Sequence, residues 1–202
     1  MAVFPEGADD AIAAGVAKQN QVQKYNISRK QQGYLPLEVG IGIHVGHMML
    51  GMVGEESRMQ GDAFSDNVNL TARLEGLTKF YGVSLLISEQ ALQNMSNSNK
   101  YQIRFLDRVI VKGRTEAIAV YEVLDAEAEE IRQLKIKTQT DFEEALKYYK
   151  YADFAQARHS FENMLSVNPT DKTAKLYLQR LEILSQRGVP ENWNGVWALT
   201  EK

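Results

Sequence analysis

The chain has 202 residues, of which 44% are hydrophobic and 24% charged, and its formal net charge at pH 7 is −3. This composition predicts a globular protein with one large or two small domains, and the small negative charge gives no support for nucleic acid as a partner. The chain contains no cysteine, which excludes disulfides and thiolate metal sites. We therefore expect a cytoplasmic protein.

The N-terminal part of the chain mixes helical and strand-like patterns. Apolar residues at helical spacing predict a helix over residues 6–31. Residues 39–54, VGIGIHVGHMMLGMVG, carry no acidic residue, Lys or Arg, but the run is shorter than the roughly 20 residues that cross a bilayer. We interpret it as part of a β-hairpin formed by residues 35–45 and 48–53, and we expect any membrane anchor of the parent protein to lie upstream.

The next segments follow in the same mixed pattern. Residues 61–65 are rich in loop-forming residues and lead into a helix predicted over residues 66–81, which Gly82 is placed to cap. The remaining predicted elements are a strand over residues 83–88, a short helix over 89–95, and two antiparallel strands joined around Gly113.

The C-terminal part is predicted to be helical. Residues 125–140 are rich in charge and are interpreted as a connector, and residues 141–188 show helical patterning with a break at 168–171. Four residues have the spacing of a tetratricopeptide repeat: Tyr148, Ala157, Phe161 and Pro169. We expect a tetratricopeptide-like helical hairpin, a third helix that caps it, and a tryptophan-containing tail that packs back on the body.

The helix predicted over residues 66–81 carries polar side chains beside its apolar stripe. Asn69 and Arg73 are four residues apart and therefore share one face of the helix. Asp66 is expected to cap the helix, with Ser65 as the alternative. Taken alone, this pattern also fits a surface helix whose Asn and Arg are simply solvated.

Several motifs together resemble the C-terminal half of a class III adenylate/guanylate cyclase catalytic domain. The motifs are GIGIHVG (40–46), VNLTARLE (68–75), and VKG (111–113) followed by VYEV (120–123). The resemblance implies an α+β fold with a ferredoxin-like βαβ core and antiparallel strands, lacking its N-terminal strands. It also implies a division into a cyclase part (1–124), the charged connector (125–140) and the helical extension with its tail (141–202).

The resemblance implies roles for four residues. Asn69 matches an asparagine that orients the ribose, and Arg73 matches an arginine that stabilises charge on the pentavalent phosphorus. Asp62 matches a position that reads the purine edge, and Lys112 a lysine that neutralises the triphosphate. Residue type alone also allows a turn-forming role for Asp62 and a solvated role for Lys112.

The chemistry of cyclisation agrees with these roles. The ribose 3′-oxygen attacks the α-phosphorus and pyrophosphate leaves, so catalysis rests on positioning and on fixed positive charge. A guanidinium donates two N–H bonds to phosphate oxygens and keeps its charge. A carboxylate at Asp62 accepts the N6–H of adenine and repels O6 of guanine. We therefore expect ATP as substrate and cyclic AMP as product, with guanylate cyclase as an alternative.

The resemblance also implies two metal ions, Mg or Mn, held by two aspartates upstream of the matched region. The opening residues, MAVFPEGADDAI, resemble the segment directly after the second aspartate, whereas Asp9 and Asp10 do not match the metal positions. We interpret these two acids as a helix start, and the histidines at 44, 47 and 159 as structural. We expect the metal ligands in a missing N-terminal part and this chain alone to be inactive.

The family resemblance implies a homodimer with active sites at the interface. One subunit would supply the metal carboxylates, and the other would supply Asp62, Asn69 and Arg73. The alternative is a non-catalytic dimerisation or protein-interaction module, in which the helical C-terminus binds a protein partner.

Overall fold

The structure is a computed structural model that describes the backbone of residues 1–55, 58–113 and 115–199, and the side chains of 1–52, 63–113 and 115–199. The elements of the first part are α1 (Ala8–Gln31), β1 (Ile41–Ile43), β2 (Met49–Glu55), β3 (Arg58–Phe64), α2 (Asp66–Tyr81), β4 (Leu85–Ser88), α3 (Glu89–Gln93), η1 (Ser98–Lys100), β5 (Ile103–Ile110), β6 (Ile118–Val123) and η2 (Leu124–Ala126). Those of the second part are α4 (Glu129–Lys137), α5 (Gln139–Lys150), α6 (Phe154–Val167), α7 (Lys172–Arg187) and β7 (Trp197–Ala198).

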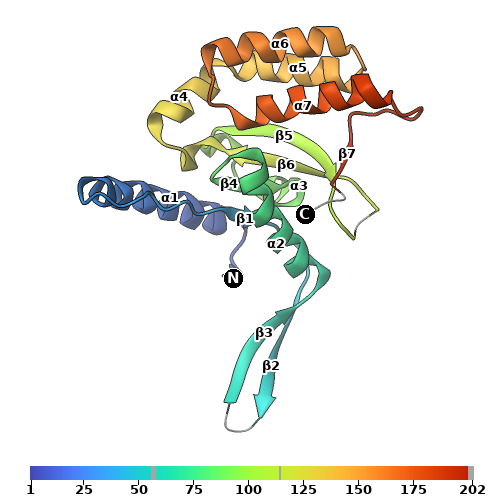
Figure 1. Cartoon of the computed structure of the whole chain (residues 1–202). Coiled ribbons are helices and arrows are strands. Elements are labelled where there is room, and N and C mark those ends of the chain that lie inside the picture. The colour runs from blue at the N-terminus through green and yellow to red at the C-terminus, as the bar shows by residue number, and fades with distance from the viewer. Residues whose placement is uncertain (56–57, 114, 200–202) are drawn as a thin grey trace.

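A five-stranded sheet with the order β1-β4-β6-β5-β7 forms the centre of the fold. β1 and β4 are parallel and α2 lies between them in sequence, whereas β4, β6 and β5 are antiparallel neighbours. A separate two-stranded sheet, β2–β3, projects away from the body (Figure 1). The predicted α+β class, with a βαβ unit and antiparallel strands, is confirmed. No described helix is both long and apolar enough to span a bilayer.

The predicted hairpin of residues 35–45 and 48–53 is wrong. β1 pairs with β4 inside the main sheet, and β2 instead pairs with β3, with Met49 opposite Phe64 and Gly51 opposite Asp62. The residues predicted to form the loop 61–65 therefore belong largely to a strand. The error has a physical reason: a short parallel strand and a hairpin strand are both brief apolar runs, and only the tertiary pairing distinguishes them.

Local signals determine the boundaries of α2. Ser65 is the N-cap, because its side chain accepts a hydrogen bond from the Asn67 amide at 2.9 Å, so the alternative to Asp66 is correct. Gly82 ends the helix with left-handed backbone angles (φ 68°, ψ 46°), as predicted. The predicted apolar stripe is buried and consists of Leu70, Leu74, Leu77 and Tyr81.

The two faces of the sheet are covered by different helices. α1 packs on the face that carries Leu85, Ile87 and Val123. α2 and the C-terminal helices share an apolar cluster with the opposite face, which carries Leu86 and Val120. Figure 1 shows α5, α6 and α7 stacked on one side of the sheet and α1 on the other.

A register shift in β5 changes which face its residues present. The shift lies between Phe105 and Asp107 in the pairing with β6, and places Asp107 opposite Val120. An extra residue in one strand reverses the alternation beyond it. Asp107 is therefore turned toward α2 and α7, where it is 1% exposed and hydrogen-bonded.

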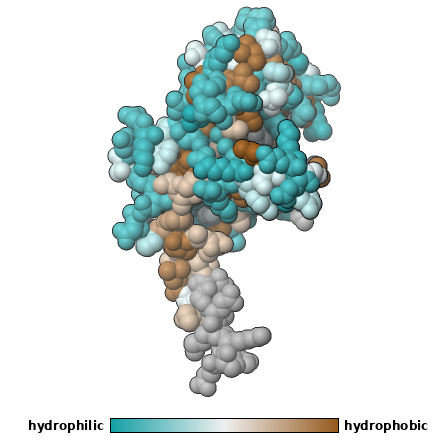
Figure 2. Space-filling model, turned by 90° about the vertical axis from the view of Figure 1, so that its left-hand side faces the viewer, coloured by the Kyte–Doolittle hydropathy of each residue, from teal (hydrophilic) through white to brown (hydrophobic). Residues whose placement is uncertain are grey.

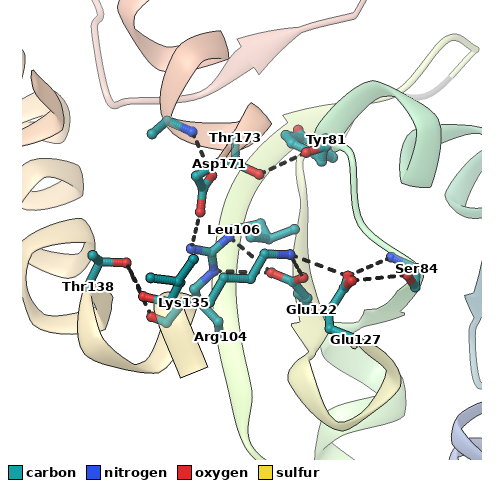
Figure 3. A network of polar contacts seen from close by, with 12 residues as sticks. Tyr81, Ser84, Arg104, Leu106, Glu122, Glu127, Lys135, Thr138, Asp171 and Thr173 are labelled. Carbon is teal, nitrogen blue, oxygen red and sulfur yellow. Dashed lines mark hydrogen bonds and ion pairs between the residues drawn. The ribbon is translucent and has the colours of Figure 1, made fainter. Parts of the chain in front are cut away.

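The charged segment 125–140 forms η2, α4 and the start of α5, and several of its polar groups are buried. Lys135 is 4% exposed and pairs with Glu122 and, at 3.3 Å, with Glu127. Glu127 in turn accepts a hydrogen bond from the Ser84 amide at 2.9 Å. The segment therefore packs against the sheet through ionic contacts (Figure 3).

The same network reaches α7. Arg104 on β5 pairs with Glu122 at 3.0 Å and with Asp171 at 2.8 Å, and its guanidinium lies 4.5 Å from the ring centre of Phe142. Asp171 also caps α7, because it accepts a hydrogen bond from the Ala174 amide. These charges thus connect β5, β6, α4 and the start of α7 (Figure 3).

The C-terminal tail packs back on the body, as predicted. Trp193 donates a hydrogen bond from Nε1 to the Tyr149 carbonyl at 3.0 Å. Trp197 and Ala198 form β7, which pairs in parallel with β5. The tail is therefore an edge strand of the main sheet.

Candidate functional site

The first two turns of α2 present two of the polar residues that the sequence singles out. Asn69 is exposed there, one turn before Arg73, which is half-buried. Ser65 caps the helix and so determines the residue at which the first turn begins. The positions of both side chains on the helix follow from that start. The predicted placement of Asn69 and Arg73 on one face of a helix is thus present in the structure.

A polar chain anchors this first turn to the end of β1. Nε2 of His44 lies 3.1 Å from Oδ1 of Asn67, and Nδ1 lies 2.8 Å from the Ser88 hydroxyl. Because the Asn67 oxygen only accepts, Nε2 donates to it and Nδ1 accepts from Ser88. Asn67 also donates to the His47 carbonyl at 2.8 Å. The sequence predicted a structural role for His44. It did not predict that the partner of His44 is Asn67, which lies two residues before Asn69.

The guanidinium of Arg73 lies against the turn between β5 and β6. A Cβ atom added at Gly113 would be 3.3 Å from Nη2 of Arg73, so the absence of a side chain lets the guanidinium approach the backbone. Nη1 of Arg73 is buried and has no hydrogen-bond partner among the described residues. A buried donor without a partner is costly, and this one is available to an anionic ligand.

Lys112 precedes Gly113 in the same turn and is exposed. The structure therefore brings the turn that carries Lys112 next to Arg73, although the two residues are far apart in sequence. Asp62 lies in β3 with its backbone opposite Gly51, and its side chain is outside the described residues. The Arg73 guanidinium and the turn that carries Lys112 are thus neighbours, and Asn69 lies one helical turn before Arg73.

The described residues do not fit a two-metal centre. Within them, no group of three or more His, Asp or Glu side chains is placed to hold a metal ion. Asp9 lies in the first turn of α1 and accepts a hydrogen bond from the Ser96 amide at 2.9 Å, and this bond holds the pKa of Asp9 below its ordinary value.

Comparison with curated proteins shows that much of the chain is similar to adenylate cyclases. It is 33% identical over 186 residues to a terminal-differentiation-specific adenylate cyclase of Dictyostelium discoideum, covering 89% of this chain and 9% of that protein. It is 40% identical over 129 residues to an adenylate cyclase of Anabaena cylindrica, covering 61% of this chain and 26% of that protein. The chain thus spans about a quarter or less of the length of these relatives.

The Dictyostelium match extends into the helical extension. A family model for the adenylate and guanylate cyclase catalytic domain matches residues 11–126. Since 89% of 202 residues is about 180, the Dictyostelium match must include a large share of the residues beyond 126.

Solved structures support the same assignment. The fold resembles the guanylyl cyclase Cya2, with a TM-score of 0.52 and 28% identity over 58% of this chain and 57% of that one. It also resembles the adenylyl cyclase CyaB from P. aeruginosa, with a TM-score of 0.50 and 26% identity over 57% of this chain and 58% of that one. The chain belongs to the adenylate and guanylate cyclase catalytic domain family.

Proposed function

We propose that this chain is the substrate-positioning part of an adenylate cyclase, which converts ATP to cyclic AMP and pyrophosphate. The observation that carries the proposal is the Arg73 guanidinium, which rests on the Gly113 turn with a buried N–H donor that has no partner among the described residues. In the proposal, this donor and Lys112 bind the phosphates, and Asn69 holds the ribose.

The physical role of Arg73 is to stabilise negative charge that grows on the phosphoryl oxygens as the 3′-oxygen attacks. A fixed donor costs no reorganisation at the moment of reaction and is strongest where water is excluded. The contact with Gly113 restricts the guanidinium on one side, which supports such preorganisation. Asn69 is exposed one turn earlier, and its amide donates to and accepts from sugar hydroxyls.

ATP is preferred over GTP in this proposal because a carboxylate at position 62 accepts from the adenine amino group. The alternative is guanylate cyclase, which the likeness to a guanylyl cyclase structure favours. The resemblance to curated adenylate cyclases at 33% and 40% identity supports ATP.

The proposed assembly is a homodimer in which the partner subunit supplies the metal carboxylates for Mg or Mn. It is supported by the projecting β2–β3 hairpin, which carries hydrophobic side chains on the part nearest the body (Figure 2). Exposed apolar residues on and beside this hairpin are Met48, Met49, Leu50, Met52 and Phe64. Contiguous exposed apolar surface of this kind marks protein contacts.

The remaining proposals concern the rest of the chain. We propose that the metal carboxylates come from segments outside these 202 residues, so that this chain alone does not turn over ATP. The family match ends at residue 126, which supports a boundary near residue 124, and the boundary at residue 140 remains a prediction. A tetratricopeptide-like role for 141–202, a protein partner for it and a cytoplasmic location remain predictions.

The test is an assay of cyclic AMP and cyclic GMP formation by an enzyme in which the metal-binding segment is joined ahead of residue 1. We expect ATP to be preferred, Asp62→Ala to weaken that preference, and Arg73→Ala to lower kcat by about 10²–10³-fold. Arg158→Ala is the control, since it removes only an exposed contact on α6. Preference for GTP would favour a guanylate cyclase, and inactivity with both nucleotides would favour a non-catalytic module.

A further inference from the structure

The C-terminal end of α2 is held by the start of α7. The Thr173 hydroxyl donates to the Tyr81 carbonyl at 3.1 Å, which satisfies one of the carbonyls that a helix end leaves without a partner. Gly82, which ends α2, packs so closely on Lys172 that an added Cβ would lie 2.3 Å from its side chain. Figure 3 shows Thr173 reaching across to Tyr81.

The side chain of Tyr81 is held from the same direction. Its hydroxyl donates to Oδ2 of Asp107 at 2.7 Å, and Nη1 of Arg180 on α7 donates to the same oxygen at 2.6 Å. Burial and the nearby Asp107 raise the pKa of Tyr81, so its hydroxyl keeps its proton and remains a donor. The last residue of α2 is therefore bonded to the extension directly through its carbonyl and through Asp107 by its side chain.

The C-terminal tail contacts the end of β5 through backbone pairing. Val109 and Ile110 pair with Trp197 and Ala198 of β7, and the Leu199 amide donates to the Ile110 carbonyl at 2.9 Å. Lys112 follows two residues after Ile110. The strand end that leads into the Lys112 turn therefore has β7 along its outer edge.

Arg180 joins these two contacts. Its guanidinium lies 5.0 Å from the ring centre of Tyr177 and 5.1 Å from that of Trp197, so it contacts both α7 and the tail. Its bond to Asp107 ties it to β5 and, through Tyr81, to α2. One buried side chain thus contacts α7, β5 and β7 and reaches α2 through a single carboxylate.

The positions of Arg73 and Lys112 depend on the two elements that the extension holds. Arg73 lies eight residues before Tyr81, which is about 12 Å along a helix axis. A helix transmits a shift of its end along its length, because its backbone bonds are made internally. A displacement at Tyr81 would therefore change the position of the guanidinium relative to the Gly113 turn.

We propose that α7 and the C-terminal tail position Arg73 relative to Lys112, with Thr173, Tyr81 and Arg180 as positioning residues. The inference rests on the proposed function, since it assigns Arg73 and Lys112 to phosphate binding. It goes beyond that function because it makes the helical extension a working part of the nucleotide site and not only an attached module.

The experiment compares Thr173→Val with Thr173→Ser in the 202-residue chain. Valine keeps the shape and loses the hydrogen bond to Tyr81, whereas serine keeps the bond. We expect Thr173→Val to speed amide exchange in residues 66–81 by roughly fivefold, to shift the Arg73 Nε–H resonance, and to weaken binding of inorganic triphosphate several-fold. Thr173→Ser should leave the amide exchange, the Arg73 resonance and the triphosphate affinity as they are in the unmodified chain.

The matched control is Thr170→Val, which removes a hydrogen bond from the Thr170 hydroxyl to Asn168 in the same loop and touches no part of α2 in the contacts described. It should leave exchange in 66–81 unchanged. The inference would be overturned if Thr173→Val accelerated amide exchange equally in α1 and α2, or if the Arg73 resonance did not shift. Thr173 would then have a purely structural role. Failure of triphosphate to bind the unmodified chain would instead count against the proposed function, while the exchange and resonance measurements still decide whether α7 positions α2.

Discussion

The charged side chains near Arg73 and those at the contact between the sheet and α7 differ in whether they are paired. At the α7 contact, Arg104 and Asp171 are almost fully buried and paired with each other. In α2 and the neighbouring β5–β6 turn, Lys112 is exposed and Arg73 keeps a buried donor without a partner among the described residues. Burying a charge is costly unless it is paired. Paired charges therefore stabilise the fold here, whereas the unpaired donor is left for a ligand.

Arg104→Met should have the largest effect on stability. It leaves the buried carboxylates of Glu122 and Asp171 without their shared cation, and breaking a buried pair in this way typically costs about 3–5 kcal/mol. Methionine still packs near Phe142, so the loss reports mainly on charge. Urea unfolding followed by tryptophan fluorescence measures it.

The exposed pair on α6 provides the contrast for this variant. Arg158 lies 3.9 Å from Glu162, and its side chain is 44% exposed. Arg158→Ala should change the unfolding free energy by less than about 0.5 kcal/mol. If Arg104→Met were as mild as Arg158→Ala, the buried network would not stabilise the contact between the sheet and α7.

Asp171→Asn should have a smaller, pH-dependent effect. Burial alone would raise the pKa of Asp171, but Arg104 outweighs it and lowers the pKa below the ordinary value of 3.8. The pair therefore contributes stability above that ordinary value and loses it as the pH falls through the lower, folded value. Asparagine still caps α7, so we expect a loss of about 2 kcal/mol near neutral pH that shrinks below about pH 4.

The measurement is the difference in unfolding free energy between the unmodified chain and Asp171→Asn from pH 3 to 7. The difference is needed because burial raises the pKa of Glu122, which acts in the opposite direction in both proteins. Asp153→Asn is the control, since Asp153 caps α6 in the same manner. A pH-independent difference for Asp171→Asn would show that its charge does not matter.

The contrast between the two regions also explains what the sequence could predict. The bounds of α2 could be predicted from Gly82 and the apolar stripe, which are local signals, although Ser65 and not the expected Asp66 caps the helix. The β2–β3 pairing was missed, because period and polarity do not specify which strand a short apolar run joins. The buried role of Lys135 was missed for a related reason: a charged segment resembles a solvated connector until its partners on distant strands are known.

In the candidate site, too, some features could be predicted from local spacing and others depend on tertiary packing. The placement of Asn69 and Arg73 on one helix face follows from their spacing. The approach of Arg73 to Gly113 joins residues 40 positions apart and depends on how α2 lies against the β5–β6 turn. Only the family resemblance connected Arg73 in advance with Lys112 of the same turn. The roles assigned to Asp62, Asn69, Arg73 and Lys112 remain predictions.

Gly113→Ala should have a smaller effect on stability than Arg104→Met or Asp171→Asn, and a selective effect on the site. Gly113 has φ +77°, where a Cβ costs about 1–2 kcal/mol, and the new methyl group would also press on the Arg73 guanidinium. Gly33 has φ +78° with nothing within 4 Å of an added Cβ. Gly33→Ala therefore reproduces the backbone strain without the contact.

We expect both alanine variants to lower the unfolding free energy by a similar amount, about 1 kcal/mol. Only Gly113→Ala should weaken the binding of inorganic triphosphate, because only there does the added methyl group displace Arg73. Calorimetric titration of the two variants and the unmodified chain measures this directly. Equal affinities in Gly113→Ala and Gly33→Ala would mean that the guanidinium tolerates displacement, and that its contact with the turn serves the fold and not the ligand.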